Sequence, residues 1–557
     1  MEIAKVQKSL ATKAQYQPTH RFNDLYRYVR DVNWLESARN AILHNHGANT
    51  PGVDGIKGKE LTRADWCALI NDTVEALRAG TYLPQPVKRV YIPKANGKQR
   101  PLGIATIQDR MVQEVLRMVL EPIYESHFLP CSNGFRPARS TMTAIHTVQL
   151  RCNEIGKFFW IVEGDIQSCF DAIPHDQLLR VLRKVIADER LLSLIWAFLK
   201  AGYVEDNQLY KPKTGTPQGG ICSPLLANAY LHELDKYWWH TYGSLTEHQR
   251  ECRRKAGQGN VYLVRYADDF LALTNGPKSQ ALQLKAELGR VLADLGLTLA
   301  ADKTLVTHVN DGFTFLGFHI QRKTKPSQPT RKALYVTATQ RNIQRYKDSI
   351  QHLLKQHDVD VVNKIRALNR VIEGWANYYR HVQTTRIRDT LENWTFWAVW
   401  RWLKRKHGGE LGDKAIHARY MAQRNPAERA TLGYGGVKLT RMSDIPFQRY
   451  YLPKGGIGNP YLSPSVNELR IGGDEPIVET TWNGISAQNS YAIARQDLLL
   501  RYGPICQGCG QTFPADELSA HHKQAQRADG KHGQANLELL CQRCHIQTPS
   551  YGKSRKM

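Results

Sequence analysis

Residues 260–273 read NVYLVRYADDFLAL, an apolar and β-rich stretch that two adjacent carboxylates, Asp268 and Asp269, interrupt near its middle. A turn at the acids would bring the chain back as a second strand, so the stretch predicts a β-hairpin. Two like charges are costly to bury side by side unless cations neutralise them. The pair therefore indicates a metal site, and an exposed hairpin tip with two solvated acids is the alternative.

A second apolar stretch, FFWIVEG at residues 158–164, ends at another carboxylate, Asp165. A carboxylate at a strand end and a pair on a tight hairpin can converge on two Mg²⁺ ions roughly 3.5–4 Å apart, an arrangement that serves in-line phosphoryl transfer. Mg²⁺ prefers oxygen ligands and keeps several waters, so a few carboxylates suffice. The two stretches together resemble the palm of a reverse transcriptase. The resemblance implies that Asp165, Asp268 and Asp269 are catalytic and bind the two Mg²⁺ ions.

The bulk composition indicates a multidomain protein with a polyanionic partner. A chain of 557 residues exceeds one domain of typical size, and 42% apolar residues suffice for packed cores. The formal net charge of +25 favours nucleic acid, because each phosphate that Lys or Arg neutralises releases counterions. No apolar run approaches the ~18–20 residues of a membrane span, and residues 1–15 lack an apolar signal region. We therefore expect a cytoplasmic protein with no membrane partner.

A basic hairpin is predicted within VKRVYIPKANGKQRPLGI, residues 87–104, because Asn96-Gly97 stands between two β-like arms. Lys94 and Arg100 flank the turn, and Arg can bind phosphate bidentately. The same stretch resembles the finger region of reverse transcriptases. The resemblance implies that both cations bind the triphosphate of an incoming nucleotide, and a solvated basic hairpin is the alternative.

Three further residues are candidates for the nucleotide site. Phe170 stands five residues beyond Asp165 and resembles the steric gate beneath the incoming sugar, although a core phenylalanine fits this spacing equally well. Gln218 lies in TPQGGICSP, residues 216–224, which resembles the template–nucleotide loop of group II intron reverse transcriptases. The glycines of that loop allow backbone to approach a ligand closely. Lys303 could reach the triphosphate, with a surface lysine as the alternative.

Outside these motifs the apolar periodicity predicts mainly helices. Helices are expected over 18–48, 64–79, 109–124 and 278–295, a strand over 312–320, and an insertion loop over 241–260. Within the strand, Leu316-Gly317-Phe318 resembles the primer-grip region. From about residue 335 basic amphipathic helices follow, as expected for a thumb that grips a nucleic acid backbone. Their segment GWANYYR, residues 374–380, resembles the maturase (X) domain of group II intron-encoded proteins.

Two CxxC pairs near the C-terminus predict a tetrahedral zinc site. They are Cys506 with Cys509 and Cys541 with Cys544. The other six cysteines are scattered singly, as reduced thiols would be. The 31 residues between the pairs exceed a simple ribbon loop, so a further element is inserted there.

The inserted element contains histidines and an asparagine in an HH…N…H order that resembles the HNH endonucleases, which are zinc-clamped ββα units. The resemblance implies that His521 and His545 bind a divalent metal ion. It also implies that His522 is the general base for water and that Asn536 orients the loop. A structural zinc knuckle that binds DNA is the alternative.

The motifs occur in the order fingers, palm, basic helical thumb and HNH unit, and this order resembles a group II intron-encoded protein. The implied fold is multidomain α+β: a right-hand polymerase with fingers and palm, an α-helical thumb or maturase domain, and a small zinc-bound ββα HNH domain. The expected boundaries are 1–60 for an N-terminal helical extension, 61–325 for fingers and palm, 326–430 for the thumb, 431–495 for a DNA-binding segment and 496–557 for the HNH domain.

The resemblance implies a protein that helps its group II intron RNA to splice, nicks the second strand of a DNA target and copies the intron into cDNA in retrohoming. Its partners would be intron RNA, target DNA, dNTPs and, as a further candidate, a second copy of the chain; its location would be a bacterial-type ribonucleoprotein on nucleoid DNA. Two alternatives differ in class. One is a splicing factor with catalytically idle acids, which a primer-extension assay would identify. The other is a free-standing reverse transcriptase of defence or mutagenesis, which would lack a structured intron around its reading frame.

Overall fold

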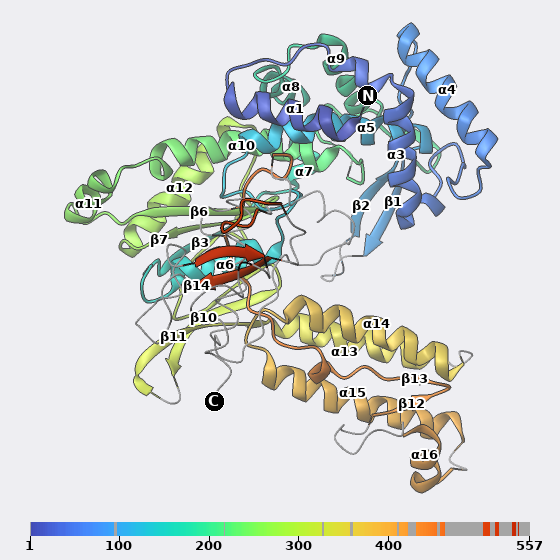
Figure 1. The fold of residues 1–557 in the computed structure, drawn as a ribbon, viewed down its shortest axis with the longest axis vertical. Coiled ribbons are helices and arrows are strands. Elements are labelled where there is room, and N and C mark those ends of the chain that lie inside the picture. Colours follow the sequence, from blue (N-terminus) through green and yellow to red (C-terminus); the bar gives the residue numbers. More distant parts are fainter. Residues whose placement is uncertain are drawn as a thin grey trace. The chain divides into compact units, whose positions relative to one another are not determined.

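The structure is a computed structural model that describes residues 2–93, 97, 99–216, 218–325, 328–356, 360–408, 411–421, 431–453, 457–462, 505–512, 518–522, 537–541 and 544. The chain divides into two compact units. The first comprises Met1–Ile445 with Tyr450–Val478, and the second comprises Pro446–Arg449 with Glu479–Met557. Helices and sheets both build the first unit, in agreement with the expected α+β class (Figure 1). No helix within the described ranges is long and apolar enough to cross a membrane.

The acidic residues lie on an antiparallel sheet with the strand order β6-β7-β3-β8. Both faces of this sheet are covered. Val162 and Ala272 pack into a core that includes α12, whereas Ile161 and Leu271 pack into a core that includes α6. Strands buried on both faces carry apolar side chains at successive positions, which explains the continuous apolar runs in the sequence. The bounds are Trp160–Asp165 (β3), Val261–Tyr266 (β6), Asp269–Thr274 (β7), Leu305–His308 (β8), Thr141–Cys152 (α6) and Lys278–Asp294 (α12).

The basic hairpin forms where the sequence predicts it, with β1 (Val87–Pro93) antiparallel to β2 (Gln99–Ile104). Gly97 in its turn has a φ of 79°, a left-handed value that glycine adopts without steric cost. β1 also pairs in parallel with β4 (Tyr203–Glu205), and β4 pairs with β5 (Gln208–Tyr210). The hairpin is therefore the edge of a four-stranded sheet.

Helix α5 (Ile107–His127) is almost entirely buried. It begins near the predicted position because the Thr106 hydroxyl accepts a hydrogen bond from the Asp109 N–H and caps the helix. Helix α1 (Ile3–Tyr16), which the sequence pattern did not indicate, packs along α5. Other helices of the first unit are Arg63–Ala79 (α4), Cys169–Ala172 (α7), His175–Arg183 (α8), Glu189–Lys200 (α9) and Ser223–Trp238 (α10).

The expected helix over 18–48 is wrong in its first part. Residues 18–25 are not helical, α2 covers only Tyr26–Val29, and α3 covers Val32–His44. Asp31 causes the break, because its carboxylate accepts hydrogen bonds from the first N–H groups of α3 and caps that helix.

The expected loop over 241–260 is also wrong, because helix α11 (Glu247–Lys255) lies within it. Thr246 starts this helix through a capping box with Gln249. The helix buries no side chain, so the sequence shows no apolar stripe that would indicate it.

The expected strand over 312–320 divides into β9 (Phe313–Phe315) and β10 (Phe318–Lys325). The chain turns between them because Leu316 and Gly317 have left-handed φ values of 49° and 80°. β10 then pairs with β11 (Gln328–Ala338), whose first five residues are exposed, whereas Val336 and Ala338 near its end are buried. This hairpin crosses the boundary expected between residues 325 and 326.

Three long helices follow where basic helices are expected, and we call them the thumb helices (Figure 1). They share an apolar core that includes Tyr346, Leu368 and Trp402. Their bounds are Gln340–Lys355 (α13), Val361–Tyr379 (α14) and Thr385–Lys406 (α15), and they precede Asp413–Tyr420 (α16), Gly433–Tyr434 (β12) and Val437–Lys438 (β13).

After the thumb helices the chain returns to α5 and α6, and we call the described part of residues 450–462 the return segment. The Tyr450 hydroxyl forms a 2.8 Å hydrogen bond with Thr143 Oγ1 on α6. The Tyr461 hydroxyl donates to Glu121 on α5. The thumb helices are thus followed by a second attachment to the part of the unit that carries the acids.

In the second unit, β14 (Leu518–His522) pairs antiparallel with β15 (Leu537–Cys541). Residues 505–512 form a tight loop in which the Cys506 N–H donates to the Gln511 carbonyl at 2.9 Å. The expected ββα arrangement extends into residues outside those described.

Candidate active site

The three predicted acids meet at one end of the sheet. Asp165, the last residue of β3, lies directly opposite Asp269, the first residue of β7. Asp268 occupies the two-residue turn between β6 and β7, together with Ala267. The structure therefore brings together carboxylates that are about a hundred residues apart in the sequence.

Burial and mutual repulsion make this cluster unfavourable as three free carboxylates. Burial raises the pKa of Asp269 to about 7, and the charges of Asp268 and Asp165 add to the effect. Burial also raises the pKa of Asp268, with a smaller contribution from Asp165, and Arg100 and Lys303 act in the opposite direction. Asp165 and Asp268 are half-buried and Asp269 keeps contact with solvent, but like charges held this close together are still stabilised by cations. The donor set therefore fits hard divalent metal ions.

Lys303 supplies one of the cations. Its ammonium group donates to Asp165 Oδ2, and this bond raises the pKa of Lys303. The loop that carries Lys303 is fixed, because the Asp165 carbonyl accepts from the Ala300 N–H at 2.9 Å and Lys285 Nζ donates to the Thr304 carbonyl at 2.6 Å. The lysine therefore lies beside the acids as part of an ordered loop.

Arg265 anchors the acidic turn from inside the protein. It is fully buried in β6, and all five of its N–H donors are used. Two donate to Asp235 at 2.8 and 2.5 Å, and the others reach Asn228 Oδ1 and the Ala267 carbonyl, both at 3.0 Å, and Ser132 Oγ at 2.8 Å. Burial alone would raise the pKa of Asp235, but the charge and hydrogen bonds of Arg265, together with His232, outweigh burial and lower the pKa to about 2.

The turn itself has a strained backbone in close contact with a glycine. Ala267 has a φ of 56°, a left-handed value that costs a non-glycine residue ~1–2 kcal/mol. A Cβ atom on Gly134 would lie only 2.5 Å from the Ala267 backbone nitrogen. Asn228 Nδ2 also donates to the Gly134 carbonyl at 2.7 Å, so Gly134 is fixed against the turn.

We expect Gly134→Ala to lower the rate of RNA-templated primer extension ~10²-fold, because the added methyl group must displace the Ala267 turn that carries Asp268. The matched control is Gly289→Ala, which lies inside α12 and would place its Cβ 3.6 Å from Leu299. The control should be stabilised by ~0.5–1 kcal/mol and keep its extension rate. Equal extension rates for the two variants would show that Gly134 does not position the turn.

Of the two finger cations, Arg100 lies on β2, and its charge acts on the pKa of Asp268. The basic hairpin thus lies within electrostatic reach of the acids. Lys94 lies outside the described residues.

Gln218 connects the basic hairpin with the region after Asp165. Its Nε2 donates to Asp171 Oδ2 at 3.0 Å, and its carbonyl accepts from the Gly103 N–H at 2.6 Å. A Cβ atom on Gly219 would lie 2.6 Å from the Gly103 carbonyl oxygen. The glycine-rich loop therefore contacts the basic hairpin through its backbone, and the predicted approach of this loop to a ligand stays a prediction.

Phe170 lies on α7 and is half-buried. Its carbonyl accepts from the Thr216 N–H at 2.7 Å. Its ring packs against the core and meets the exposed ring of Phe135 in an edge-to-face contact, with 6.2 Å between centroids. The ring is therefore neither wholly inside the core nor free of it.

The maturase-like segment at the end of α14 contacts the turn between β9 and β10. The Tyr378 hydroxyl donates to the Leu316 carbonyl at 2.8 Å, and the Tyr379 hydroxyl donates to the Gly317 carbonyl at 2.9 Å. The rings of Tyr378 and Phe318 stack with their centroids 5.2 Å apart. The segment thus fixes the turn that resembles a primer grip.

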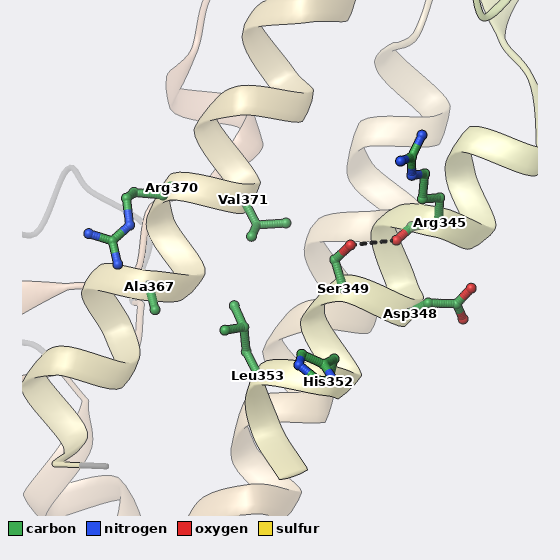
Figure 2. Close-up of a pocket in the computed structure, with 8 residues that line it drawn as sticks. All are labelled: Arg345, Asp348, Ser349, His352, Leu353, Ala367, Arg370 and Val371. Carbon is green, nitrogen blue, oxygen red and sulfur yellow. Dashed lines mark hydrogen bonds between the residues drawn. The ribbon is translucent and has the colours of Figure 1, made fainter. Parts of the chain in front are cut away.

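A shallow groove of about 530 Å³ runs between α13 and α14 (Figure 2). Leu353, Ala367 and Val371 lie between the two helices, and Arg345 and Arg370 stand on opposite helices (Figure 2). Arg345 and Arg370 favour a ligand that carries phosphates, whereas the Asp348 carboxylate, which also lines the groove, opposes one (Figure 2).

The four cysteines of the CxxC pairs meet in the second unit, where their sulfur atoms lie within 4.8 Å of one another. Burial opposes ionisation of Cys506, but hydrogen bonds from the N–H groups of Cys541, Cys509 and Gly508 outweigh burial and lower its pKa to about 6. With Cys544 as the fourth ligand, this sulfur set fits Zn²⁺.

His521 and His522 are the last two residues of β14 and lie opposite Glu538 and Leu537 of β15. Asn536 directly precedes Leu537 in the sequence. Asn536 and His545 lie outside the described residues.

Comparisons with known proteins match this order of sites. Residues 92–320 match the model of the reverse transcriptase (RNA-dependent DNA polymerase) family, residues 343–420 match the group II intron maturase-specific domain, and residues 506–548 match the HNH endonuclease family. Protein YkfC of Escherichia coli (strain K12) is 39% identical over 58% of this chain and 89% of its own length. The group II intron-encoded protein LtrA of Lactococcus lactis subsp. cremoris is 37% identical over 54% of this chain. The chain belongs to the group II intron-encoded proteins.

This group II intron-encoded protein matches only part of the length of some of its relatives. The matched part spans 57% of LtrA. An uncharacterized 91 kDa protein in the cob intron of Schizosaccharomyces pombe is 31% identical over 62% of this chain and 49% of its own length. The maturase-specific match disfavours the alternative of a free-standing reverse transcriptase, and the predicted order of polymerase, maturase and HNH parts is confirmed.

The sequence did not reveal which residues of this group II intron-encoded protein hold the acids in place. Arg265, Asp235 and Asn228 form that support, and none was a candidate before the structure. One signal was present, because an arginine inside the apolar strand directly before the acids requires a buried partner.

Proposed function

We propose that this protein binds its intron RNA and helps it to splice, nicks the second strand of a DNA target, and uses the freed 3′-OH to prime cDNA synthesis on the intron RNA. The observation that carries the polymerase part is the register of β3 and β7, which sets Asp165 opposite Asp269 with Asp268 in the adjacent turn. The domain matches support the RNA and DNA partners.

In the palm, Asp165, Asp268 and Asp269 would hold two Mg²⁺ ions. Divalent ions at such a site activate the attacking 3′-oxygen and stabilise the leaving phosphate oxygen. The protein's own contribution is preorganisation: Arg265 fixes the turn through the Ala267 carbonyl, and the strand register fixes Asp165.

The incoming dNTP would lie between the basic hairpin and the acids. Arg100 and Lys94 bind its triphosphate from the fingers, and Lys303 meets it from the palm side, since its ammonium group already lies at Asp165. Gln218 orients the nucleotide from the glycine-rich loop. Phe170 stands beneath the sugar and excludes a ribonucleotide through contact with its 2′-OH.

The thumb helices would bind RNA. The groove between α13 and α14 offers Arg345 and Arg370 to phosphates. We assign fingers and palm to a part that begins at residue 61 and includes the whole β10–β11 hairpin, which ends at Ala338. The thumb and maturase part then covers the helices that follow, up to residue 430, and the HNH part covers 496–557. We assign residues 431–495 to a segment that binds DNA.

In the HNH part, Cys506, Cys509, Cys541 and Cys544 would hold Zn²⁺ as a structural ion. His521 and His545 would bind a separate divalent ion, with Asn536 orienting the loop between them. His522 would take the proton from the attacking water. The match of residues 506–548 to the HNH endonuclease family supports this role.

We expect His522→Ala to keep zinc but to lose second-strand nicking by ~10²–10⁴-fold, because only the general base is removed. Cys506→Ser should release zinc and unfold the C-terminal part, because small zinc domains draw their folding free energy from the metal. Both variants should extend a supplied primer on an RNA template at the wild-type rate.

The measurements are zinc content, nicking of a duplex target and primer extension, each on the full-length chain bound to its RNA. Cys252→Ser is the matched control, because Cys252 is exposed on α11, far in sequence from the zinc ligands. Normal nicking by His522→Ala would contradict the HNH assignment and favour the alternative of a zinc knuckle that binds DNA. Loss of primer extension in Cys506→Ser would show that the two parts do not fold independently.

A further inference from the structure

Phe135 combines a strained backbone with an exposed aromatic ring. Its φ is 57°, in the left-handed region that bulky residues rarely adopt, and its side chain is 54% exposed. An exposed ring gains little from burial, so packing into the core does not offset the strain. Strained residues of this kind concentrate at functional sites, where the surrounding structure enforces them.

The residues on both sides of Phe135 enforce its conformation. On one side the Gly134 carbonyl accepts from Asn228 Nδ2 at 2.7 Å. On the other side Arg136 forms a buried ion pair with Glu125 at 2.9 Å, and both side chains are at most 3% exposed. Arg136 Nη1 also donates to the Leu129 and Ser132 carbonyls at 2.9 and 2.8 Å. The chain therefore cannot relax at Phe135 by rotating its neighbours.

The ring held in this way contacts Phe170. The two ring planes lie at 81° to each other with 6.2 Å between centroids, which is the edge-to-face geometry that aromatic pairs prefer. The backbone of Phe170 is fixed by the hydrogen bond from Thr216, so the remaining freedom lies in its side-chain torsions. The ring of Phe135, which is itself exposed, limits those torsions on the side of Phe170 that it contacts.

The same segment adjoins the acids. Gly134, the residue before Phe135, packs directly against the Ala267 backbone in the turn that carries Asp268. One short stretch of chain thus contacts both the metal-binding turn and the ring proposed to lie beneath the sugar.

We propose that Phe135 is a specificity-determining residue of the polymerase site, which positions the Phe170 ring so that it excludes a 2′-OH. The inference rests on the proposed role of Phe170 as a steric gate. Phe135 acts through Phe170 and is a positioning residue. The strained backbone of Phe135 holds its ring at the surface.

The test is the ratio of kcat/KM for a dNTP to that for the matching rNTP in primer extension by the full-length protein. The variants are Phe135→Ala, Phe135→Gly, Phe170→Ala and the double variant with Ala at both positions. We expect Phe170→Ala to lower the ratio strongly and Phe135→Ala to lower it about tenfold, near the upper limit for loss of one aromatic pair. The double variant should resemble Phe170→Ala alone, because Phe135 acts only through that ring.

Phe135→Gly separates the ring from the backbone. Glycine adopts the left-handed φ without strain, so this variant should have a higher thermal midpoint than Phe135→Ala and an equally lowered ratio. A ratio that returns to the wild-type value in Phe135→Gly would assign the effect to strain and overturn the proposal.

The remaining outcomes distinguish the inference from the function on which it rests. If Phe170→Ala lowers the ratio and Phe135→Ala does not, the gate stands and the role of Phe135 is refuted. If the two single effects add in the double variant, Phe135 acts independently and the positioning role is refuted. If Phe170→Ala leaves the ratio unchanged in an active enzyme, the gate assignment fails and the inference fails with it.

Discussion

Asp268→Asn is expected to lower RNA-templated DNA synthesis by at least ~10³-fold, because the loss of one ligand charge at a two-metal site removes several kcal/mol of transition-state stabilisation. The same change should leave the metal-free protein as stable as the wild type or more stable. The raised pKa of Asp268 shows that the fold disfavours its charge, chiefly through burial, so a neutral side chain removes that cost.

The two effects are measured by single-turnover primer extension and by the thermal midpoint in the presence of a chelator. Asp294→Asn is the control, because Asp294 is an exposed acid at the end of α12 and lies outside the proposed site. If Asp268→Asn extends the primer within tenfold of the wild-type rate, Asp268 is not a ligand of the proposed metal site. A lowered thermal midpoint would instead indicate that the variant is misfolded and that its lost activity has a structural cause.

Arg265→Leu is expected to lower the free energy of unfolding by ~3–5 kcal/mol, because it leaves the buried Asp235 carboxylate without a partner. It should also abolish primer extension, since the Ala267 carbonyl loses its donor and the acidic turn loses its anchor. Urea unfolding and primer extension measure the two losses.

A double variant separates stability from positioning. Arg265→Leu with Asp235→Leu replaces a buried ion pair by two apolar side chains, a change that proteins tolerate far better than the loss of one partner. We expect the double variant to regain most of the stability and none of the activity, because the turn is still without its anchor. If the double variant extends the primer at the wild-type rate, Arg265 stabilises the fold but does not position the acids.

The acids were predictable because each one is a local feature of the sequence. Asp165, Asp268 and Asp269 end or interrupt apolar strands, and a charge in such a place is visible without knowledge of its neighbours. The CxxC pairs are equally local, and their convergence follows from the ligand number of zinc. The roles of the HNH residues beyond the strand positions of His521 and His522 stay predictions.

The supporting residues were not predictable because their meaning depends on partners that are distant in the sequence. Arg265 is understood only with Ser132 and Asp235, and the exposure of Phe135 only with the buried pair that follows it. Helix α11 buries no side chain and the first half of β11 is exposed, so neither element was predicted from an apolar pattern.

The return segment attaches the chain that follows the thumb helices to α6, so the region has a second attachment. One lies where Tyr378 and Tyr379 hold the turn between β9 and β10, and the other where Tyr450 meets Thr143. Further contacts join the same region, since Gln383 Oε1 accepts from the Val336 N–H and Asn342 Nδ2 donates to the Gly317 carbonyl. Contacts at several places therefore restrict how the thumb helices can move relative to the sheet that carries the acids.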